Sequence, residues 1–224
     1  MKSRFFLTYN SKQSEKRKNN LLESGEQIIQ YLEELAEVLA DLKVNAPFHM
    51  LITGGAYMLL RDKRRSTLDI DFALVENPQP EMLPDQAFPL TVKKTEISRK
   101  TTTVPYSAEF KQAVRIVARR HGNLPPDWLN DEAAVYYYDD APQAEGTLWR
   151  SFGGILYVYL PTMEYILATK IAAYRPKDAG DIQLLIQELN IHTRAQARAI
   201  VDKFLLPDAQ EFWEVDEKLE ILFP

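Results

Sequence analysis

Two aspartates at alternate positions of an apolar segment constrain this chain more than any other feature of its sequence. Asp69 and Asp71 stand in the run LDIDFALV, which has the composition of a buried strand. Alternate side chains of a strand share a face, so we expect both carboxylates on one face and Leu68, Ile70 and Phe72 on the other. Carboxylates that lose hydration side by side repel each other unless a cation compensates them. The pattern therefore predicts a cation site on this strand.

A glycine pair precedes these aspartates. Gly54 and Gly55 follow the apolar run MLI and precede AYMLL, which suits a short helix. Glycine lets the backbone approach a ligand closely, and free amides at a helix start favour an anion. A hard divalent ion, Mg²⁺ or Mn²⁺, fits the carboxylates when substrate phosphates complete its shell. Together the two motifs indicate metal-assisted phosphoryl or nucleotidyl transfer, whereas either motif alone is as typical of a tight turn or a chance pairing.

The order of these motifs resembles the nucleotidyltransferase superfamily of the polymerase-beta type. The resemblance is carried by Gly-Gly, a basic loop and R-x-T-x-D-x-D at residues 65–71. The chain is most similar to bacterial abortive-infection (AbiEii-like) toxins and their uncharacterised relatives. This implies a metal-dependent NTP site with Gly54 and Gly55 on the triphosphate and Asp69 and Asp71 on the metal. Many superfamily members have Gly-Ser, so one hydroxyl contact to phosphate is missing here.

A second signature lies further along the chain. Lys170 stands in the apolar stretch ILATKIAA, where a lysine either extends its ammonium to solvent or contacts a phosphate or carboxylate. The pattern K-hxA-x-R-x-KD-hxD resembles the toxin-like group. That resemblance implies that Lys170 holds the triphosphate and acts in catalysis, that Asp178 completes the acidic set, and that Arg175 assists. Asp181 is alternatively an acid of a helix's first turn.

The loop before the aspartates and the later strands leave questions open. Arg64 and Arg65 are expected to steer triphosphate and Thr67 to hydrogen-bond near the carboxylates, the alternative being a solvent-exposed turn. Superfamily members often place a third acid on a neighbouring strand, but ILYVYL at 155–160 carries none. That acid must come from elsewhere or be absent. The phrase DWLND at 127–131 also resembles the toxin-related family.

Composition limits the classes of protein to consider. The 224 residues are 46% hydrophobic, which is ample for a core, and contain no cysteine, which excludes disulfides and thiolate metal sites. With 27 basic and 32 acidic residues the net charge is −5, so a globally basic nucleic-acid binder is disfavoured despite local basic clusters at 12–18, 61–65 and 115–121. Neither a membrane-spanning segment nor a secretory signal is expected, and we predict a cytoplasmic protein.

Periodicity predicts an α/β (α+β) fold with a small mixed sheet. We expect a core with an N-terminal helix over 1–106, then a mostly helical half over 107–224 whose hairpin near 147–160 contributes to the same cleft. The expected elements are a helix from about Glu23, a strand at 48–53, a proline-rich loop at 77–89, helices over 107–120 and from about Asp127, strands at 148–152 and 155–160 around Gly153-Gly154, a helix opened by Pro161, one capped by Thr193, and a last helix from Pro207 that buries Phe212, Val215, Leu219 and Leu222. The tyrosines at 136–138 are expected to pack in and around the core rather than to stack on bases.

The function predicted is transfer of a nucleotide from an NTP to an acceptor hydroxyl. The resemblance implies a tRNA, another nucleic acid or a protein as acceptor, and a toxin role would require an antitoxin partner. Two alternatives remain open: a non-catalytic binding module that keeps the fold, and a small-molecule, antibiotic-type nucleotidyltransferase. The latter would need extra acids for a cationic acceptor, which the segment 127–140 can supply.

Overall fold

The computed structural model describes residues 21–76, 86–92, 97–98, 101–102, 108–122, 124–131 and 144–224. Its helices are α2 (Gly25–Asp41), α3 (Gly54–Leu60), α4 (Ala108–Arg120), α5 (Met163–Ala173), α6 (Ala179–Glu188), α7 (Arg194–Phe204), α8 (Pro207–Phe212) and α9 (Val215–Leu222), with a 3-10 turn, η2, at Pro176–Asp178. Its strands are β1 (Phe48–Ile52), β2 (Ile70–Leu74), β3 (Phe88–Leu90), β4 (Ile97–Ser98), β5 (Thr101–Thr102), β6 (Leu129–Asn130), β7 (Ala144–Phe152) and β8 (Leu156–Pro161).

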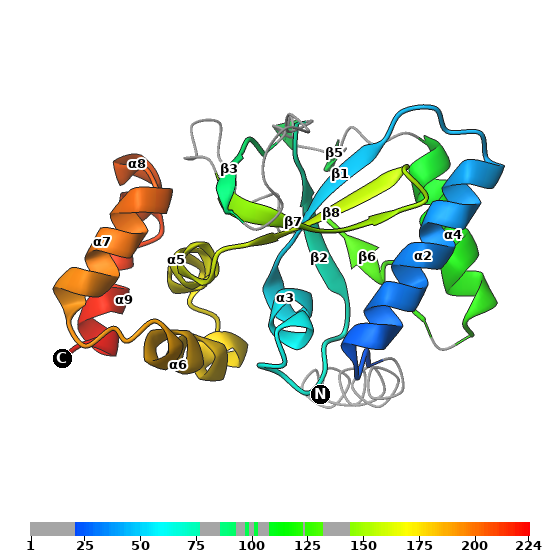
Figure 1. The fold of residues 1–224 in the computed structure, drawn as a ribbon. Coiled ribbons are helices and arrows are strands. Elements are labelled where there is room, and N and C mark those ends of the chain that lie inside the picture. The colour runs from blue at the N-terminus through cyan, green and yellow to red at the C-terminus, as the bar shows by residue number, and fades with distance from the viewer. Residues whose placement is uncertain are drawn as a thin grey trace, which may run out of the picture.

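A six-stranded mixed sheet organises the molecule, in the order β3-β7-β8-β1-β2-β6. Strand β1 runs antiparallel to β2 and parallel to β8, and β2 runs parallel to β6. The remaining neighbours, β7 with β8 and β3 with β7, are antiparallel. Figure 1 shows α2 and α4 together at one end of the sheet and α5 to α9 at the other. The fold is thus mixed α/β, as predicted.

The first described helix forms for the reason its sequence suggests. Ser24 caps α2 by accepting a hydrogen bond from the Gln27 amide. The apolar stripe at three- and four-residue spacing lies inward, and Ile28, Leu32, Leu35 and Leu39 are all fully buried. Leu42, the last residue of the predicted stripe, is the C-cap and is partly buried. This helix packs against α4, which places it beside the sheet. The prediction of an amphipathic helix here is confirmed.

The predicted hairpin is also present. Gly153 and Gly154 connect β7 to β8 with φ values of +56° and +67°, a conformation that favours glycine. Strand β8 then pairs with β1, so the hairpin is part of the main sheet. The sheet therefore takes strands from both sides of residue 106, the boundary expected from the sequence. The chain after Pro161 forms helices α5 to α9 and contributes no further strand to the sheet.

Several short elements differ from expectation. Phe88–Leu90 forms β3 at the sheet edge instead of the end of a loop, and Leu129–Asn130 forms β6 instead of a helix. Both gain backbone hydrogen bonds from strands distant in sequence, which local propensity does not register. Pro161 ends β8, and the next helix begins at Met163 with Thr162 as its N-cap. Thr193 caps α7 with a full capping box, as predicted.

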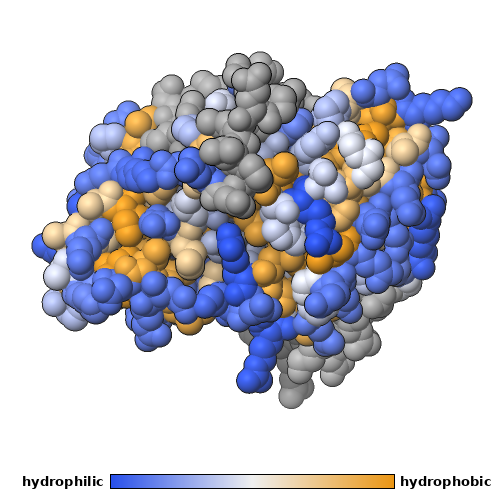
Figure 2. Space-filling view, in the orientation of Figure 1, coloured by the Kyte–Doolittle hydropathy of each residue, from blue (hydrophilic) through white to orange (hydrophobic). Residues whose placement is uncertain are grey.

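The C-terminal end consists of two short helices instead of one. Glu214 adopts φ +49° between α8 and α9, which breaks the helix. Val215 and Leu219 are buried as expected and Leu222 is partly buried, but Phe212, which lies before the break, is 64% exposed. Figure 2 shows apolar residues among the hydrophilic surface at this end of the molecule.

Some expectations lie outside the described residues. These are the basic cluster at 12–18, Ser107 as a cap, and the tyrosines at 136–138. Within the part of the chain that the structure describes, no helix combines the length and apolar character needed to cross a bilayer.

The buried stripe of α2 makes a direct prediction about stability. Replacing Leu35 by alanine is expected to lower the free energy of unfolding by about 2–5 kcal/mol, because it removes buried methyl groups and leaves a cavity. Glu37→Ala, on the exposed face of the same helix, should change it by less than about 0.5 kcal/mol. Urea unfolding followed by circular dichroism measures both. Equal effects would mean that this helix does not pack as described.

Candidate functional site

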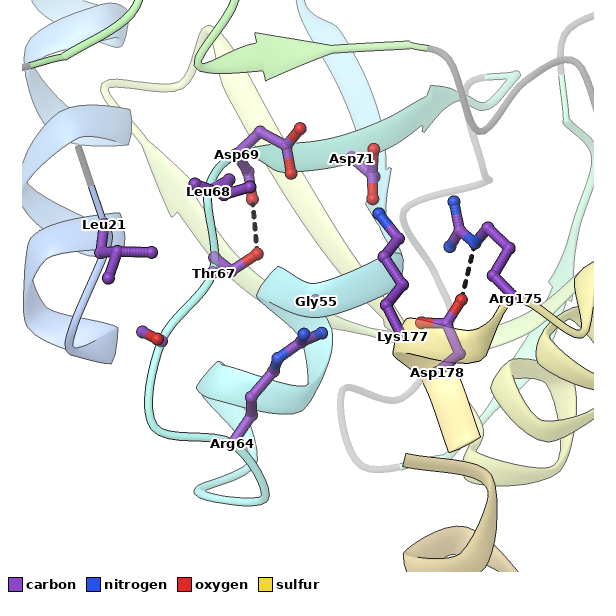
Figure 3. A pocket seen from close by; sticks show the side chains of 11 residues that line it. Leu21, Gly55, Arg64, Thr67, Leu68, Asp69, Asp71, Arg175, Lys177 and Asp178 are labelled. Atoms are coloured by element: carbon purple, nitrogen blue, oxygen red, sulfur yellow. Dashed lines mark hydrogen bonds and ion pairs between the residues drawn. The ribbon is translucent and has the colours of Figure 1, made fainter. Parts of the chain in front are cut away.

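A cleft of about 410 Å³ lies between β2, the start of α3 and the η2 turn. Its volume falls within the range of roughly 300–1,000 Å³ typical of small-ligand pockets. Figure 3 shows the side chains around it, which come from segments more than a hundred residues apart. The lining residues are Leu21, Gly55, Arg64, Ser66, Thr67, Leu68, Asp69, Asp71, Arg175, Lys177 and Asp178.

Asp69 and Asp71 both open into this cleft, and both are partly exposed. Ile70 and Phe72 between and beyond them are fully buried, as strand alternation predicts. Leu68 differs from expectation: it is 39% exposed and lines the cleft. The reason is that β2 begins at Ile70, so Leu68 belongs to the preceding loop and does not follow the alternation.

Backbone contacts hold the first aspartate in place. Thr67 exchanges two hydrogen bonds with Leu22, at 2.8 and 2.9 Å, and its Oγ1 donates to the Asp69 carbonyl oxygen at 3.2 Å. The Ile70 amide donates to the Trp128 carbonyl oxygen at 2.7 Å. Thr67 thus lies near the carboxylates as predicted, but its hydroxyl is hydrogen-bonded to the backbone. The segment that carries Asp69 is fixed from both sides.

The glycine pair lies directly against the site. The Thr53 amide donates to the Asp71 carbonyl oxygen at 2.9 Å, which places Gly54 beside the Asp71 side chain. Gly54 has φ +61°, and a Cβ there would overlap Oδ2 of Asp71. A Cβ on Gly55 would overlap Oγ1 of Thr67. Glycine is therefore required at both positions for the backbone to pass this close to the carboxylate and the hydroxyl.

Burial and charge act in opposite directions on Asp69. Burial, the largest influence, raises the pKa of Asp69, and the negative charge of Asp127 adds to this. The positive charges of Lys177 and Arg175 and a hydrogen bond from Asn130 lower the pKa, but the net direction is upward. A carboxylate in this position binds a proton or a cation more readily than one in water.

The strand beside β2 supplies an amide to the site. Asn130 on β6 lies opposite Asp71 in parallel register, and its side chain hydrogen-bonds Asp69. Asp127, exposed on the preceding turn, is near enough to act on Asp69 electrostatically. Among the residues that the structure describes, no three acidic, histidine or cysteine side chains converge as a metal site. The two cleft carboxylates still fit Mg²⁺, which commonly binds one or two protein carboxylates and takes its remaining ligands from water and substrate phosphate.

Lys170 lies inside the protein and does not line the cleft. It is 4% exposed, and its Nζ donates to Asp178 Oδ1 and Asp181 Oδ2, each at 2.8 Å. The sequence allowed Lys170 either to extend to solvent or to contact a phosphate or carboxylate, and the structure shows a contact with two carboxylates. Its predicted role on the triphosphate is not accompanied by a contact with the cleft and stays a prediction.

Asp178 joins the buried lysine to the cleft. Asp178 is 1% exposed, and its Oδ2 accepts a hydrogen bond from Arg175 Nε at 2.6 Å. Burial by itself would raise the pKa of Asp178, but the hydrogen bonds and charges of Lys170 and Arg175 outweigh it and lower the pKa. Both oxygens are thus bound to cations, which leaves this carboxylate poorly placed to accept a proton from a substrate.

The basic residues of the site agree only in part with those selected on sequence. Arg64 lines the cleft and donates to Asp181 Oδ2 at 3.3 Å, whereas Arg65 is exposed and is not among the lining residues. Lys177 lines the cleft but was not identified from the sequence. The signal for it was its position next to Asp178 in the RPKD segment, which the structure folds into the η2 turn.

No protein-family model, curated protein or solved structure matches this chain. The resemblance to nucleotidyltransferases therefore rests on the motif residues and stays a prediction.

The contact between Gly54 and Asp71 can be tested by substitution. Gly54→Ala is expected to lower the free energy of unfolding by at least about 1–2 kcal/mol, since a side chain at φ +61° is strained and its Cβ would displace the Asp71 carboxylate. Gly180→Ala is the control, because that glycine lies in α6 with open space around it and should gain up to about 1 kcal/mol. Denaturant unfolding compares them. A neutral Gly54→Ala variant would contradict the geometry described here.

The lowered pKa of Asp178 predicts a pH-dependent stability. Its ion pairs stabilise the fold above the ordinary aspartate pKa of 3.8, and this contribution is lost as pH falls through the lower folded-state value. The difference in unfolding free energy between wild type and Asp178→Asn should therefore shrink from about pH 6 to about pH 2.5. Asp41→Asn, at an exposed site outside these ion pairs, is the control substitution. A difference that does not vary with pH would argue against the buried ion pairs.

Proposed function

We propose that this protein is a metal-dependent nucleotidyltransferase that moves a nucleotide from an NTP to an acceptor hydroxyl. The observation that carries the proposal is that Asp69 and Asp71 line the same cleft. The glycine bend, Gly54 and Gly55, lies directly beside Asp71, and cationic side chains line the facing wall. The paired carboxylates suit a metal ion, and the glycine backbone and the positively charged wall suit the phosphates that the metal would chelate.

Asp69 and Asp71 would hold the metal, Mg²⁺ or Mn²⁺. When bound there, the ion offsets the charge of the phosphates and of the oxygen atoms that react. The protein's own part is to fix both carboxylates, through the backbone contacts of Thr67 and Thr53 and the Asn130 side chain. The glycine bend at Gly54 and Gly55 would receive the phosphates, with Thr67 and Arg64 beside it. Arg65, which the sequence also suggested for this role, is exposed and does not line the cleft.

In the proposed reaction the acceptor hydroxyl oxygen attacks the α-phosphorus. The bond from that phosphorus to the oxygen bridging to the β-phosphate breaks, pyrophosphate leaves, and the hydroxyl proton passes to a base. Asp178, which the resemblance implies completes the acidic set, has both carboxylate oxygens hydrogen-bonded to cations, which favours a supporting role over that of a general base. Positioning and charge stabilisation would supply most of the rate enhancement in such chemistry.

The acceptor is a tRNA, another nucleic acid or a protein in this proposal, and the reaction takes place in the cytoplasm. If the protein acts as a toxin, an antitoxin protein restrains it. One experiment addresses the acceptor directly: α-labelled NTPs incubated with the protein and Mg²⁺ in the presence of tRNA, protein extract or aminoglycosides. The fraction that becomes labelled identifies the class of acceptor, including the small-molecule alternative.

A non-catalytic nucleotide-binding module is the second candidate. Asn130 favours it, since β6, the strand that neighbours β2, contributes an amide and no acid to the site. Such a module would show a thermal shift with NTP and Mg²⁺, worth about 2.7 kcal/mol at a hundred times the Kd, but no transfer. Absence of a shift with every nucleotide would count against both candidates.

The two aspartates provide the decisive variants. Asp69→Asn and Asp71→Asn are each expected to abolish Mg²⁺-dependent labelling, because each removes a charge that would hold the metal. Both variants should stay folded, since amide and carboxylate have the same shape and both sites are partly exposed. Asp62→Asn, an exposed acid outside the cleft lining, should retain activity. Full Mg²⁺-dependent activity in either cleft variant would overturn the assignment.

A further inference from the structure

The turn between α5 and α6 carries two cations into the cleft. Arg175 and Lys177 lie on either side of Pro176, and both line the cleft. The Arg175 side chain is 38% exposed and Lys177 is exposed. Figure 3 shows the Lys177 side chain extending from the turn toward Asp71, with Arg175 beside it. The turn therefore forms a positive wall that faces the carboxylates.

Among the cleft cations that the structure describes, Lys177 differs in that no ion pair matches its charge. Arg175 and Arg64 each already donate to an aspartate, at 2.6 and 3.3 Å. Among the described residues, Lys177 makes no hydrogen bond or ion pair within contact distance, although its charge acts on Asp69. A cation whose charge is already matched attracts a further anion weakly, whereas an unmatched one attracts it strongly.

Lys170, in contrast to Lys177, is buried and already forms ion pairs. Its ammonium is buried between Asp178 and Asp181, so two negative charges surround one positive charge. Asp178 in turn binds Arg175, and the Asp178 amide donates to the Arg175 carbonyl oxygen at 2.8 Å, which closes the turn. Lys170 thus reaches the η2 turn through Asp178, and it is also connected to Arg64 through Asp181. Its loss would leave two carboxylates without their shared partner at the base of the turn.

We propose that Lys177, with Arg175 beside it, binds the β- and γ-phosphates of the nucleotide, and that Lys170 is a positioning residue which holds this turn through Asp178. The inference rests on the proposed function and assigns to Lys177 the triphosphate contact that the sequence suggested for Lys170. An ammonium on a flexible stem can follow a polyphosphate chain and offers three donors to it.

Isothermal titration with each of the four NTPs in MgCl₂, and with the corresponding monophosphates, tests the first part. Lys177→Ala is expected to weaken triphosphate binding by about tenfold or more, since it removes a charge-assisted contact, and to leave monophosphate binding unchanged. Lys177→Arg should restore most of the affinity. Lys203→Ala removes an exposed lysine from α7, outside the cleft, and should bind like wild type.

A pair of substitutions tests the second part. If Lys170 acts only through Asp178, then Lys170→Met and Asp178→Asn weaken triphosphate binding to a similar extent, and the double variant is no weaker than either single one. If Lys170 touches phosphate, the losses add. Thermal unfolding of every variant checks that it is folded, and the Lys177 series stays decisive because that side chain is exposed.

The outcomes separate this inference from the proposed function. If wild type binds no NTP in the presence of Mg²⁺, the proposed function fails and this inference fails with it. If wild type binds NTPs and Lys177→Ala binds them equally well, the inference alone is overturned. Additive losses for Lys170 and Asp178 would overturn the positioning role. Selective loss of triphosphate affinity in Lys177→Ala, with rescue by Lys177→Arg, supports it.

Discussion

The placement of two carboxylates on one face of a half-buried strand is the constraint on which the site depends. Hydrogen bonds fix the backbone at Asp69 and Asp71, and burial raises the pKa of Asp69. Positive charges on the η2 segment and an amide from β6 lower the pKa of Asp69 and offset part of the effect of burial. A site in which acids are held together before any ligand arrives is suited to binding a cation.

The second constraint is the buried charge set around Lys170. One ammonium and two carboxylates lie almost out of solvent, and Arg64 and Arg175 extend the set toward the cleft. Arg64 follows α3 in the sheet half, whereas the acids precede and begin α6 in the helical half. The ion pairs that compensate the buried charges therefore also connect the two walls of the cleft. Such an arrangement fixes geometry more than it adds stability.

The sequence predicted those parts of the fold that local patterns specify. The α2 stripe, the Gly153-Gly154 hairpin and the Thr193 cap follow from spacing, turn chemistry and capping, and all three are present. The short strands β3 and β6 were not predicted, since each is held by hydrogen bonds to a strand far away in the chain. The break at Glu214 was also missed, because α8 and α9 share one apolar pattern.

By itself the sequence determined the common face of Asp69 and Asp71 and the glycine bend that precedes them, because strand alternation and glycine's lack of a side chain are local properties. Only the tertiary structure decided which cations face those acids. Lys170 and Lys177 are seven positions apart on one segment, yet one is buried between carboxylates and the other lines the cleft. The turn at Pro176–Asp178 and its packing against the sheet half separate them, and no spacing rule encodes that difference.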